Sequence, residues 1–599
     1  MQFIYDAWDR EYKTPFGAVK QGEAIEIAVK TNADAVTVVG LEAPAAMEKT
    51  DGGFRLRFVP KKEKGLYFYH FEAVFKGQKK RFGKCVDSGK SCENGRDYQL
   101  TVHSNGSVPD WFKGKTMYQI YVDRFFKGDA KDTMPRDHVL MHTSWDEAPV
   151  YIKNDRGEIV LWDFFGGNLA GVIEKLPYIK NLGVDIIYLN PIFEAVSNHK
   201  YDTADYSRVD RMYGTNDTLK KLVKAAGKLG IKIMLDGVFS HTGEDSIYFN
   251  KYKHYGDGGA YQDKKSPYFD WYHFKKFPDD YDCWWGVKAL PAVNELNPTY
   301  MKYLLDEKTG VVTQWMKAGV AGWRLDVADE LPDAFIRALK TCVLTANPEA
   351  VLLGEVWEDA SNKVSYETPR EYILGSALDS VSNYPLREAL IDLLTGSGSV
   401  NDFANVVMTL QENYPPDIFR ALMNMTGTHD TSRLFTLLGD APAFEALTTW
   451  QARDYRLPKA QAELAEKRMM LYYLALFTLP GNPCIYYGDE IGMQGYKDPY
   501  NRGTFSWETR DTQMADWVKQ LGILRKQLGI AQGSVQFFAS DGVLKYEITT
   551  ESQNVMVYIN PMNLTADIPR AKKEAVLTYL ATADEDWVHI DALGAAVLR

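Results

Sequence analysis

The segment "GWRLDVADE" (322–330) places a guanidinium, Arg324, two residues from a carboxylate, Asp326. Apolar residues alternate with these charged ones, as in a buried strand, where side chains point to opposite faces with period two. Arg324 and Asp326 therefore share one face. Because buried charges are costly unless they are paired, they form either a structural ion pair or part of a reactive site in which Arg324 keeps Asp326 ionised.

Other polar residues that could do chemistry follow further strand-like runs. In chain order they are His199, Tyr201, Asp202, Asp236, His241, Glu355, His429 and Asp430. Asp326, Glu355 and Asp430 come from three different runs. Crowded carboxylates repel one another and raise each other's pKa, which is unusual in an arrangement built for stability. Paired carboxylates in different environments are the proton donor and nucleophile of glycoside hydrolysis, and the three residues predict that chemistry.

The elements that must position these residues form a repeating pattern. From Trp111 onward, strand-like runs alternate with helical ones such as 169–183 and 217–230. Eight strand-like runs lie at 117–125, 184–193, 231–239, 322–330, 350–357, 376–384, 419–430 and 484–490. The alternation predicts a (β/α)8 TIM barrel over 111–528, with an inserted subdomain at 241–300 after the third strand. Active sites of this fold gather at the carboxyl ends of the strands, where the residues named above lie.

Short alternating strands flank the predicted barrel at both ends of the chain. Runs such as "AIEIAVKT" and "GLYFYHFEAVF", separated by turn-rich stretches, predict an N-terminal β-sandwich over 1–110. Residues 104–110, "SNGSVPD", have the composition of a linker. After residue 529 the short strands return, and they predict a C-terminal β-sandwich over 529–599.

Composition excludes several classes of partner. A net charge of −11 argues against binding to nucleic acid or an anionic membrane. No apolar run approaches the about 18 residues of a membrane span. The start, "MQFIYDAWDREYK", lacks the pattern of a signal peptide, and the five cysteines lack metal-type spacing, so a cytoplasmic protein with reduced thiols is expected. An aromatic content of 13% would suit either sugar rings or large cores.

Four short motifs that contain these polar residues also resemble sequence regions of a known family. "DGVFSH", "GWRLDVADE", "GEVW" and "TGTHD", in this order on successive predicted strands, are similar to four sequence regions of the α-amylase superfamily of glycoside hydrolases. "LPAVN" (290–294) and "HKYDTADY" (199–206) resemble two further regions. The resemblance runs from Trp111 to about residue 528. The preceding strands, together with "PDWFKGKTMYQIYVDRF", most resemble the neopullulanase, cyclomaltodextrinase and maltogenic amylase group, in which the N-terminal sandwich is carbohydrate-binding-module-like.

The resemblance implies roles for individual residues. Asp326 would be the nucleophile, Glu355 the general acid/base, and Asp430 the third catalytic carboxylate, which binds sugar hydroxyls. Residues expected to bind substrate are His199, Tyr201, His241, Arg324, Trp357, His429, Asp498 and Arg502. Asp202 and Asp236 would support the site. Trp284 and Trp285 are expected in the core rather than at the ligand.

The implied activity is a retaining hydrolysis of α-1,4-glucosidic bonds, with α-1,6 bonds left open, in maltodextrins, cyclodextrins, pullulan or starch. Transglycosylation or isomerisation on the same barrel, and a non-catalytic glucan-binding role, are the alternatives. No cofactor is required by this chemistry. The resemblance also allows a homodimer through the N-terminal domain.

Calcium is the one metal that the resemblance raises. Ser240 replaces an Asn that binds calcium in many α-amylases, and in the loop 125–135 Lys127 and Asn168 stand where the group often has Asn and Asp. Asp129 and Asp132 are the candidate ligands that remain. A lysine there would repel a cation that prefers several oxygen ligands, so we expect Lys127 to take the place of the metal.

Overall fold

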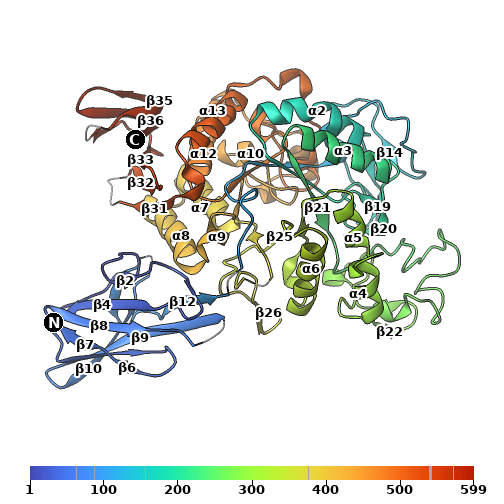
Figure 1. Ribbon diagram of the computed structural model, residues 1–599. Helices are drawn as coiled ribbons and strands as arrows, with labels where there is room; N and C mark the ends of the chain where they lie inside the picture. Colours follow the sequence, from blue (N-terminus) through green and yellow to red (C-terminus); the bar gives the residue numbers. More distant parts are fainter. Residues whose placement is uncertain are drawn as a thin grey trace.

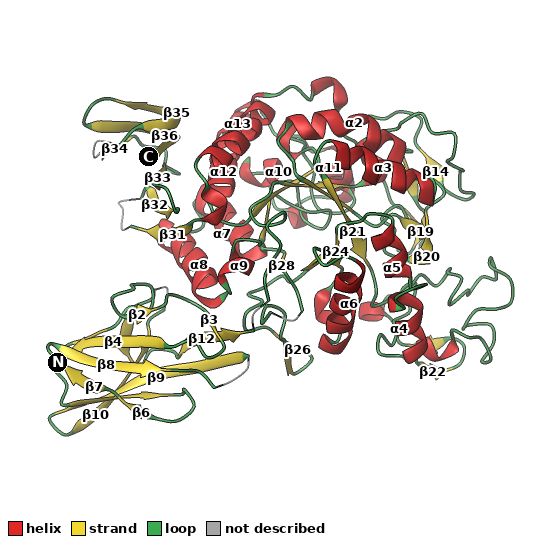
Figure 2. Ribbon diagram, viewed as in Figure 1, coloured by secondary structure: helices red, strands yellow, loops and turns green. Residues whose placement is uncertain are grey.

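The computed structural model describes residues 1–599 except 62–63, 87, 105, 156, 376, 539–541 and 571–572. Figure 1 shows a central barrel with its helices, an N-terminal group of strands (blue) and a C-terminal group (red), both drawn to the left of the barrel. Figure 2 shows that helices are concentrated around the barrel, whereas both flanking parts are built from strands. Among the described residues, no helix has the length and apolar character needed to cross a bilayer.

Eight parallel strands form the barrel, as the sequence predicts. They are β13 (Met117–Ile120), β18 (Ile186–Leu189), β21 (Lys232–Gly237), β24 (Gly322–Leu325), β25 (Val351–Gly354), β28 (Ser380–Val381), β29 (Met423–Met425) and β30 (Asn482–Tyr486). Their order is β28-β25-β24-β21-β18-β13-β30-β29. A parallel bridge between Ser382 and Met423 joins the two outer strands and closes the barrel. Because all strands run the same way, their carboxyl ends meet at one end of the barrel.

Several strands are shorter than their sequence patterns. The first strand ends at Ile120, and Val122–Phe125 forms the short helix α1. The fourth strand ends at Leu325, because Val327 takes a left-handed conformation with φ 37° and a 3-10 turn follows. Apolar alternation therefore continued past the ends of the hydrogen-bonded strands into segments that are buried for other reasons.

Helices surround the barrel where the helical runs predict them. The first two are α2 (Leu169–Asn181) and α3 (Asn216–Lys228). Helix α3 begins with a capping box between Thr215 and Thr218, and it buries Leu219 and Leu222 against the barrel. The remaining helices are α4 (Pro298–Leu305), α5 (Val311–Lys317), α6 (Asp333–Ala346), α7 (Tyr384–Thr395), α8 (Val400–Asn413), α9 (Pro416–Phe419), α10 (Leu434–Leu438), α11 (Thr449–Asp454), α12 (Lys459–Thr478) and α13 (Gln513–Gln527).

The insertion after β21 contains little regular structure. It includes two 3-10 turns, η1 (Phe269–Trp271) and η2 (Trp284–Gly286), and the hairpin β22 (Phe274–Lys276) and β23 (Asp280–Tyr281). Its core consists of aromatic rings, with Phe249 packed on Tyr272 and Tyr248 packed on Trp271. Side-chain packing rather than backbone pairing therefore shapes this segment.

The N-terminal strands form the predicted sandwich of two sheets around one core. One sheet contains β1 (Phe3–Ile4), β2 (Lys13–Thr14), β4 (Ile25–Thr31), β7 (Glu48–Thr50) and β8 (Gly53–Phe58). The other contains β3 (Val19–Lys20), β5 (Ala35–Val39), β6 (Ala45–Ala46), β9 (Gly65–Phe75), β10 (Gln78–Lys84), β11 (Ser91–Glu93) and β12 (Tyr98–His103). A buried ion pair of 2.6 Å between Lys84 and Glu412 of α8 joins this sandwich to the barrel.

The C-terminal strands form the predicted β-domain, in which six strands are joined in one continuous sheet. The strands are β31 (Ser534–Phe537), β32 (Leu544–Thr549), β33 (Asn554–Ile559), β34 (Ala566–Pro569), β35 (Ala575–Ala583) and β36 (Trp587–Leu598). The long strand β36 pairs with β33 over its second half and with β34 over its first, so it connects both halves of the sheet. One face packs on the barrel core and the other encloses a small core of its own.

Candidate active site

The predicted site residues meet at the carboxyl end of the barrel. Asp236 lies on β21 directly opposite Arg324 on β24, in the register of the two strands. Asp326 follows β24 by one residue, and Glu355 follows β25 by one residue. Neighbouring parallel strands thus bring one guanidinium and three carboxylates to the same end.

Arg324 contacts all three of these carboxylates. Its Nη1 lies 2.8 Å from Asp236 Oδ1 and 2.8 Å from Asp326 Oδ1, and its Nη2 lies 2.8 Å from Glu355 Oε2. All four side chains are buried. The pair suggested by the sequence is therefore part of a cluster of four charged groups, and the contact between Arg324 and Glu355 was not expected from the strand pattern.

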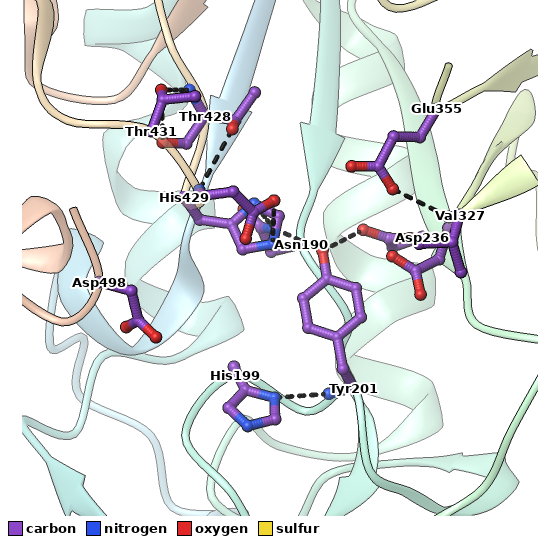
Figure 3. A network of polar contacts seen from close by, with 12 residues as sticks. Asn190, His199, Tyr201, Asp236, Val327, Glu355, Thr428, His429, Thr431 and Asp498 are labelled. Atoms are coloured by element: carbon purple, nitrogen blue, oxygen red, sulfur yellow. Dashed lines mark hydrogen bonds and ion pairs between the residues drawn. The ribbon is translucent and has the colours of Figure 1, made fainter. Parts of the chain in front are cut away.

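The backbone after β24 positions Glu355. Val327 is held at φ 37°, a conformation that costs a β-branched residue free energy and is more common at functional sites than elsewhere. In this conformation its N–H donates to Glu355 Oε2 at 2.8 Å. The indole N–H of Trp357 donates to the other oxygen, Oε1, at 3.2 Å. Figure 3 shows Glu355 and Val327 in this contact.

Burial dominates the electrostatics of the cluster. It raises the pKa of Asp326 and of Glu355, while Arg324 lowers both, and the charge of Glu355 raises the pKa of Asp326 further. One cation cannot neutralise three ionised carboxylates, so the cluster retains a proton to higher pH than separate carboxyl groups do. The expectation that Arg324 keeps Asp326 ionised thus captures only one of two opposing effects on its pKa.

His429 and Asp430 form the side of the site that follows β29. The Nδ1 of His429 accepts from Asn190 at 3.1 Å and from Gln119 at 3.3 Å, so the proton of a neutral ring lies on Nε2, which is 3.3 Å from Asp430 Oδ2. Burial, with Arg502 and Arg324 nearby, holds the pKa of His429 well below its usual value. The ring of Tyr201 stacks on that of His429, with centroids 5.0 Å apart (Figure 3).

Tyr201 links this side to the charged cluster. Its hydroxyl donates to Asp236 Oδ2 at 2.9 Å, and Tyr188 donates to the same oxygen at 2.5 Å. His199 accepts from the backbone N–H of Tyr201 at 3.1 Å, and its ring packs against Trp162. The two predicted aromatic residues therefore belong to one hydrogen-bonded wall of the site.

His241 lies at the start of the insertion. Its Nδ1 is 3.0 Å from the hydroxyl of Ser240, and its buried Nε2 has no hydrogen-bond partner among the described residues. Burial lowers the pKa of His241 to about 4. A neutral ring with one free nitrogen is suited to bind a hydroxyl group.

Two further groups of predicted residues flank the site on opposite sides. After β30, Arg502 Nη1 lies 2.7 Å from Asp498 Oδ1, and Arg502 Nη2 lies 3.7 Å from Asp430 Oδ1. After β25, the ring of Trp357 stacks on Tyr384 with centroids 3.9 Å apart. Because β30 and β25 are far apart in the strand order, a ligand that contacts both groups must cross the mouth of the barrel.

Comparison with known proteins agrees with this geometry. The family model described as the alpha amylase catalytic domain matches residues 119–528. The chain belongs to the alpha-amylase family. It is 34% identical to an amylopullulanase of Thermoanaerobacter thermohydrosulfuricus, over 87% of this chain but only 39% of that protein, and 36% identical to a cyclomaltodextrinase of Geobacillus thermopakistaniensis, over 77% of this chain and 71% of that one. The chain thus spans less than half the length of the first curated relatives it matches.

A solved structure of another protein has a similar fold. The cyclic alpha-maltosyl-(1→6)-maltose hydrolase of Arthrobacter globiformis superposes with a TM-score of 0.67 at 27% identity, covering 82% of this chain and 99% of that chain. The predicted resemblance to the family and the predicted barrel are therefore both confirmed.

The two residues expected to support the site differ in position. Asp236 lies within the charged cluster. Asp202 does not contact that cluster; it accepts hydrogen bonds from the hydroxyl and the backbone N–H of Ser197, and so holds the 197–202 turn that leads to Tyr201. The support from Asp202 is therefore indirect.

Two of the three candidate oxygen ligands in and beside the loop 125–135 are engaged with other protein groups. Asn168 is engaged with protein, since its side chain accepts from Gly171 N at 2.8 Å and donates to Gly128 O at 3.0 Å. Asp132 accepts from the hydroxyl of Thr218, Asp129 is exposed, and the exposed Lys127 runs beside Gly166. Asn168 and Asp132 are thus engaged with protein groups, and Asp129, beside the cation of Lys127 in the same loop, is the candidate ligand that remains exposed.

Sequence reasoning missed several residues that shape the site. Asn190 and Gln119 orient His429 through hydrogen bonds to its Nδ1. The hydroxyl of Tyr188 donates to Asp236, and the ring of Tyr384 stacks on Trp357. Gln119 and Asn190 do carry a signal, because each is a polar residue on or next to an apolar barrel strand. Tyr188 and Tyr384 do not, since buried tyrosines are common in the core of this protein.

Proposed function

We propose that this protein is a retaining glycoside hydrolase that cleaves α-1,4-glucosidic bonds. The observation that carries the proposal is the binding of Asp326 and Glu355 to neighbouring nitrogens of the same guanidinium. This arrangement favours the short separation of about 5–5.5 Å between the two carboxyl groups of retaining enzymes, rather than the wider gap that inverting enzymes leave for water.

The proposed reaction has two steps. Glu355 protonates the oxygen of the glucosidic bond while Asp326 attacks C1, so the C1–O bond breaks and an Asp326 glucosyl ester forms. Glu355, now ionised, then removes a proton from water, whose oxygen attacks C1 and releases Asp326. A shared proton within the carboxylate cluster suits this division of roles, because one group must start protonated and the other ionised.

The other residues of the site are proposed to hold the sugar. His241, with its free Nε2, and His429 with Asp430 would bind hydroxyls of the sugar at the cleavage point, and Tyr201 would pack against its ring. Asp498 and Arg502 would hold the next sugar on one side. Trp357, which is half-exposed, would contact the leaving-group sugar on the other.

The substrate class is proposed from the names of the relatives. An amylopullulanase and a cyclomaltodextrinase are both at least 34% identical to this chain. We therefore propose maltodextrins, cyclodextrins, pullulan and starch as candidates, with α-1,6 cleavage in addition. Chromatography of the products from each of these four substrates identifies the preferred one.

The stereochemistry of the first product tests the mechanism. NMR of maltoheptaose during the first turnovers should show the α-anomer before mutarotation, and added glucose should yield transfer products, because a hydroxyl can replace water in the second step. Asp326→Asn and Glu355→Gln should each lower kcat at least about a thousandfold with unchanged circular dichroism. An initial β-anomer, or near-normal turnover in either variant, contradicts the assignment.

Three further properties are proposed with the function. The reaction is proposed to need no calcium, because Lys127 stands at the loop position where the resemblance would lead us to expect an Asn ligand. The five free cysteines fit a reducing cytoplasm. A homodimer through the N-terminal domain is proposed from the resemblance alone, and sedimentation of the full chain with and without residues 1–110 tests it.

A further inference from the structure

The backbone directly after Asp326 is strained where it contacts Glu355. Val327 has φ 37°, and Ala328–Glu330 forms a 3-10 turn behind it. A β-branched residue keeps this conformation only where its surroundings enforce it. The conformation is the one in which the Val327 N–H donates to Glu355 Oε2 at 2.8 Å (Figure 3). Whatever holds the turn in place therefore also holds this hydrogen bond.

Asp329, in the middle of the turn, is bound through its carbonyl and both carboxylate oxygens. Oδ1 accepts from the hydroxyl of Tyr372 at 2.7 Å, and Oδ2 lies 3.1 Å from Lys363 Nζ. The carbonyl accepts from Arg370 Nη1 at 3.0 Å and from the hydroxyl of Ser365 at 3.2 Å. All four partners lie in the segment 363–372, which follows β25, so this one segment holds the turn.

A small hairpin brings the two cations of this segment together. It consists of β26 (Val364–Ser365) and β27 (Thr368–Pro369), and the N–H of Arg370 donates to the carbonyl of Lys363 at 2.9 Å across its base. The Arg370 side chain is 5% exposed and also pairs with Asp333 of α6 at 3.1 Å. Lys363 and Arg370 are thus neighbours in a fixed frame, rather than two independent surface side chains.

The N-terminal sandwich holds the same segment at both ends. Gln99 of β12 is buried; its Nε2 donates to the hydroxyl of Ser361 at 3.0 Å, and its Oε1 accepts from Asn362 at 2.8 Å. Lys64 pairs with Glu371 at 2.6 Å. Asn362 and Glu371 each lie one residue from a cation that binds the turn. A chain of contacts therefore runs from the sandwich to the backbone beside the reactive cluster.

We propose that Asp329 is a positioning residue for Glu355, which it serves by keeping the N–H of Val327 on Oε2. The inference rests on the proposed function, in which Glu355 is the general acid/base. Oε2 accepts from the Val327 N–H and lies 2.8 Å from Arg324 Nη2, so the acidic proton belongs on Oε1. The fixed turn therefore selects the oxygen that delivers the proton to the glucosidic bond.

Two substrates that differ in their need for a proton test the proposal in the full-length protein. Cleavage of maltoheptaose requires Glu355 to protonate the departing oxygen, whereas α-maltosyl fluoride loses fluoride with little help from an acid. Because kcat/KM includes the first step but not the second, Asp329→Ala should lower it about thirtyfold for maltoheptaose and less than about threefold for the fluoride. A merely structural role of Asp329 predicts equal losses on the two substrates.

Variants of Lys363 test the same point without removing Asp329. Lys363→Met should lower the ratio of the two kcat/KM values about tenfold, whereas Lys363→Arg, which keeps the cation, should stay within about threefold of wild type. The control is Lys113→Met, which removes a cation of similar burial that pairs with Asp417 of α9 at 3.4 Å, and it should leave the ratio unchanged. Lys363→Met decides the proposal if Asp329→Ala does not fold.

The pH profile gives a readout that loss of stability would not move. Burial raises the pKa of Glu355, whereas Arg324 and the Val327 N–H lower it. The charged groups that face Glu355, which are Arg324, Asp326 and Asp430, stay the same in these variants. Weakening the Val327 hydrogen bond should therefore move the alkaline limb of kcat/KM for maltoheptaose up by about half a pH unit in Asp329→Ala.

Three results overturn the positioning role: equal losses on the two substrates, no loss in either variant, or an unmoved alkaline limb. Hydrogen–deuterium exchange of residues 324–331 needs no activity and should be faster in Asp329→Ala than in wild type; unchanged exchange also overturns the role. If the wild-type protein hydrolyses neither substrate, the proposed function fails, and the exchange measurement then still decides whether Asp329 holds the turn.

Discussion

Replacing Arg324 by Met should make stability strongly dependent on pH. The guanidinium lies 2.8 Å from Asp236, Asp326 and Glu355, and burial already raises the pKa of each of these carboxyl groups. Methionine approximates the length of the side chain but supplies no charge. The variant must therefore take up protons to fold, because three buried carboxylates without a cation repel one another.

The size of the effect follows from the free energy of protonation. A carboxyl group whose unfolded pKa is about 4 costs about 4 kcal/mol to keep protonated at pH 7 and about 1.4 kcal/mol at pH 5, at about 1.36 kcal/mol per pH unit. The folded variant binds more protons than its unfolded chain, so its stability falls as pH rises. The deficit relative to wild type should therefore grow by about 2.7 kcal/mol between pH 5 and pH 7 for each carboxyl group that takes up a proton.

Urea unfolding of both proteins at pH 5, 6 and 7 measures this deficit. Arg324→Lys is the matched control, because it keeps the charge but cannot reach three carboxylates at once, and it should show a smaller pH-dependent deficit. A deficit for Arg324→Met that is large but equal at all three pH values would refute the reasoning, since it would show that lost packing rather than unbalanced charge destabilises the variant.

Three other predictions follow from the structure. Glu412→Gln should lower the free energy of unfolding by about 3–5 kcal/mol in calorimetry, because it leaves Lys84 and Lys13 buried without an anion, and a loss below 1 kcal/mol would contradict this. Burial raises the pKa of Glu295 to about 8, so the wild type loses stability as pH rises from about 4.5 to 8. If Glu295→Gln matches the wild type at pH 5, it should exceed it by about 4 kcal/mol at pH 9, and equal stability at pH 9 would count against the assignment. A chelator should shift the melting temperature by less than about 2 °C, because only a ligand bound to the native state raises it, and a larger drop restored by calcium would show a metal site.

Local sequence patterns are enough to predict the barrel and the end of it at which the clustered carboxylates lie. The period-two pattern of Arg324 and Asp326 and the alternation of strand-like and helical runs are local properties, and parallel strands must end together. Asp236, Asp326, Glu355 and Asp430 could therefore be assigned to one end of the barrel without coordinates. Strand lengths could not be predicted in this way. Apolar residues such as Tyr121 and Val327 continue beyond the last residue of β13 and of β24 that pairs with a neighbouring strand.

The contacts that connect these residues to one another follow from the three-dimensional fold and not from local sequence. Glu355 and Asp326 both form ion pairs with Arg324. His429 accepts hydrogen bonds from Asn190 and Gln119. Glu330 accepts hydrogen bonds from Trp285 and Tyr366. Each of these contacts joins segments that lie in different loops or strands, and no local periodicity encodes such a distance. The sequence predicts Trp285 in the core because tryptophan is usually buried, but Trp285 is exposed, with a left-handed backbone and a hydrogen bond from its indole to Glu330. Loop conformation and long-range hydrogen bonds, which depend on the whole fold, determined that outcome.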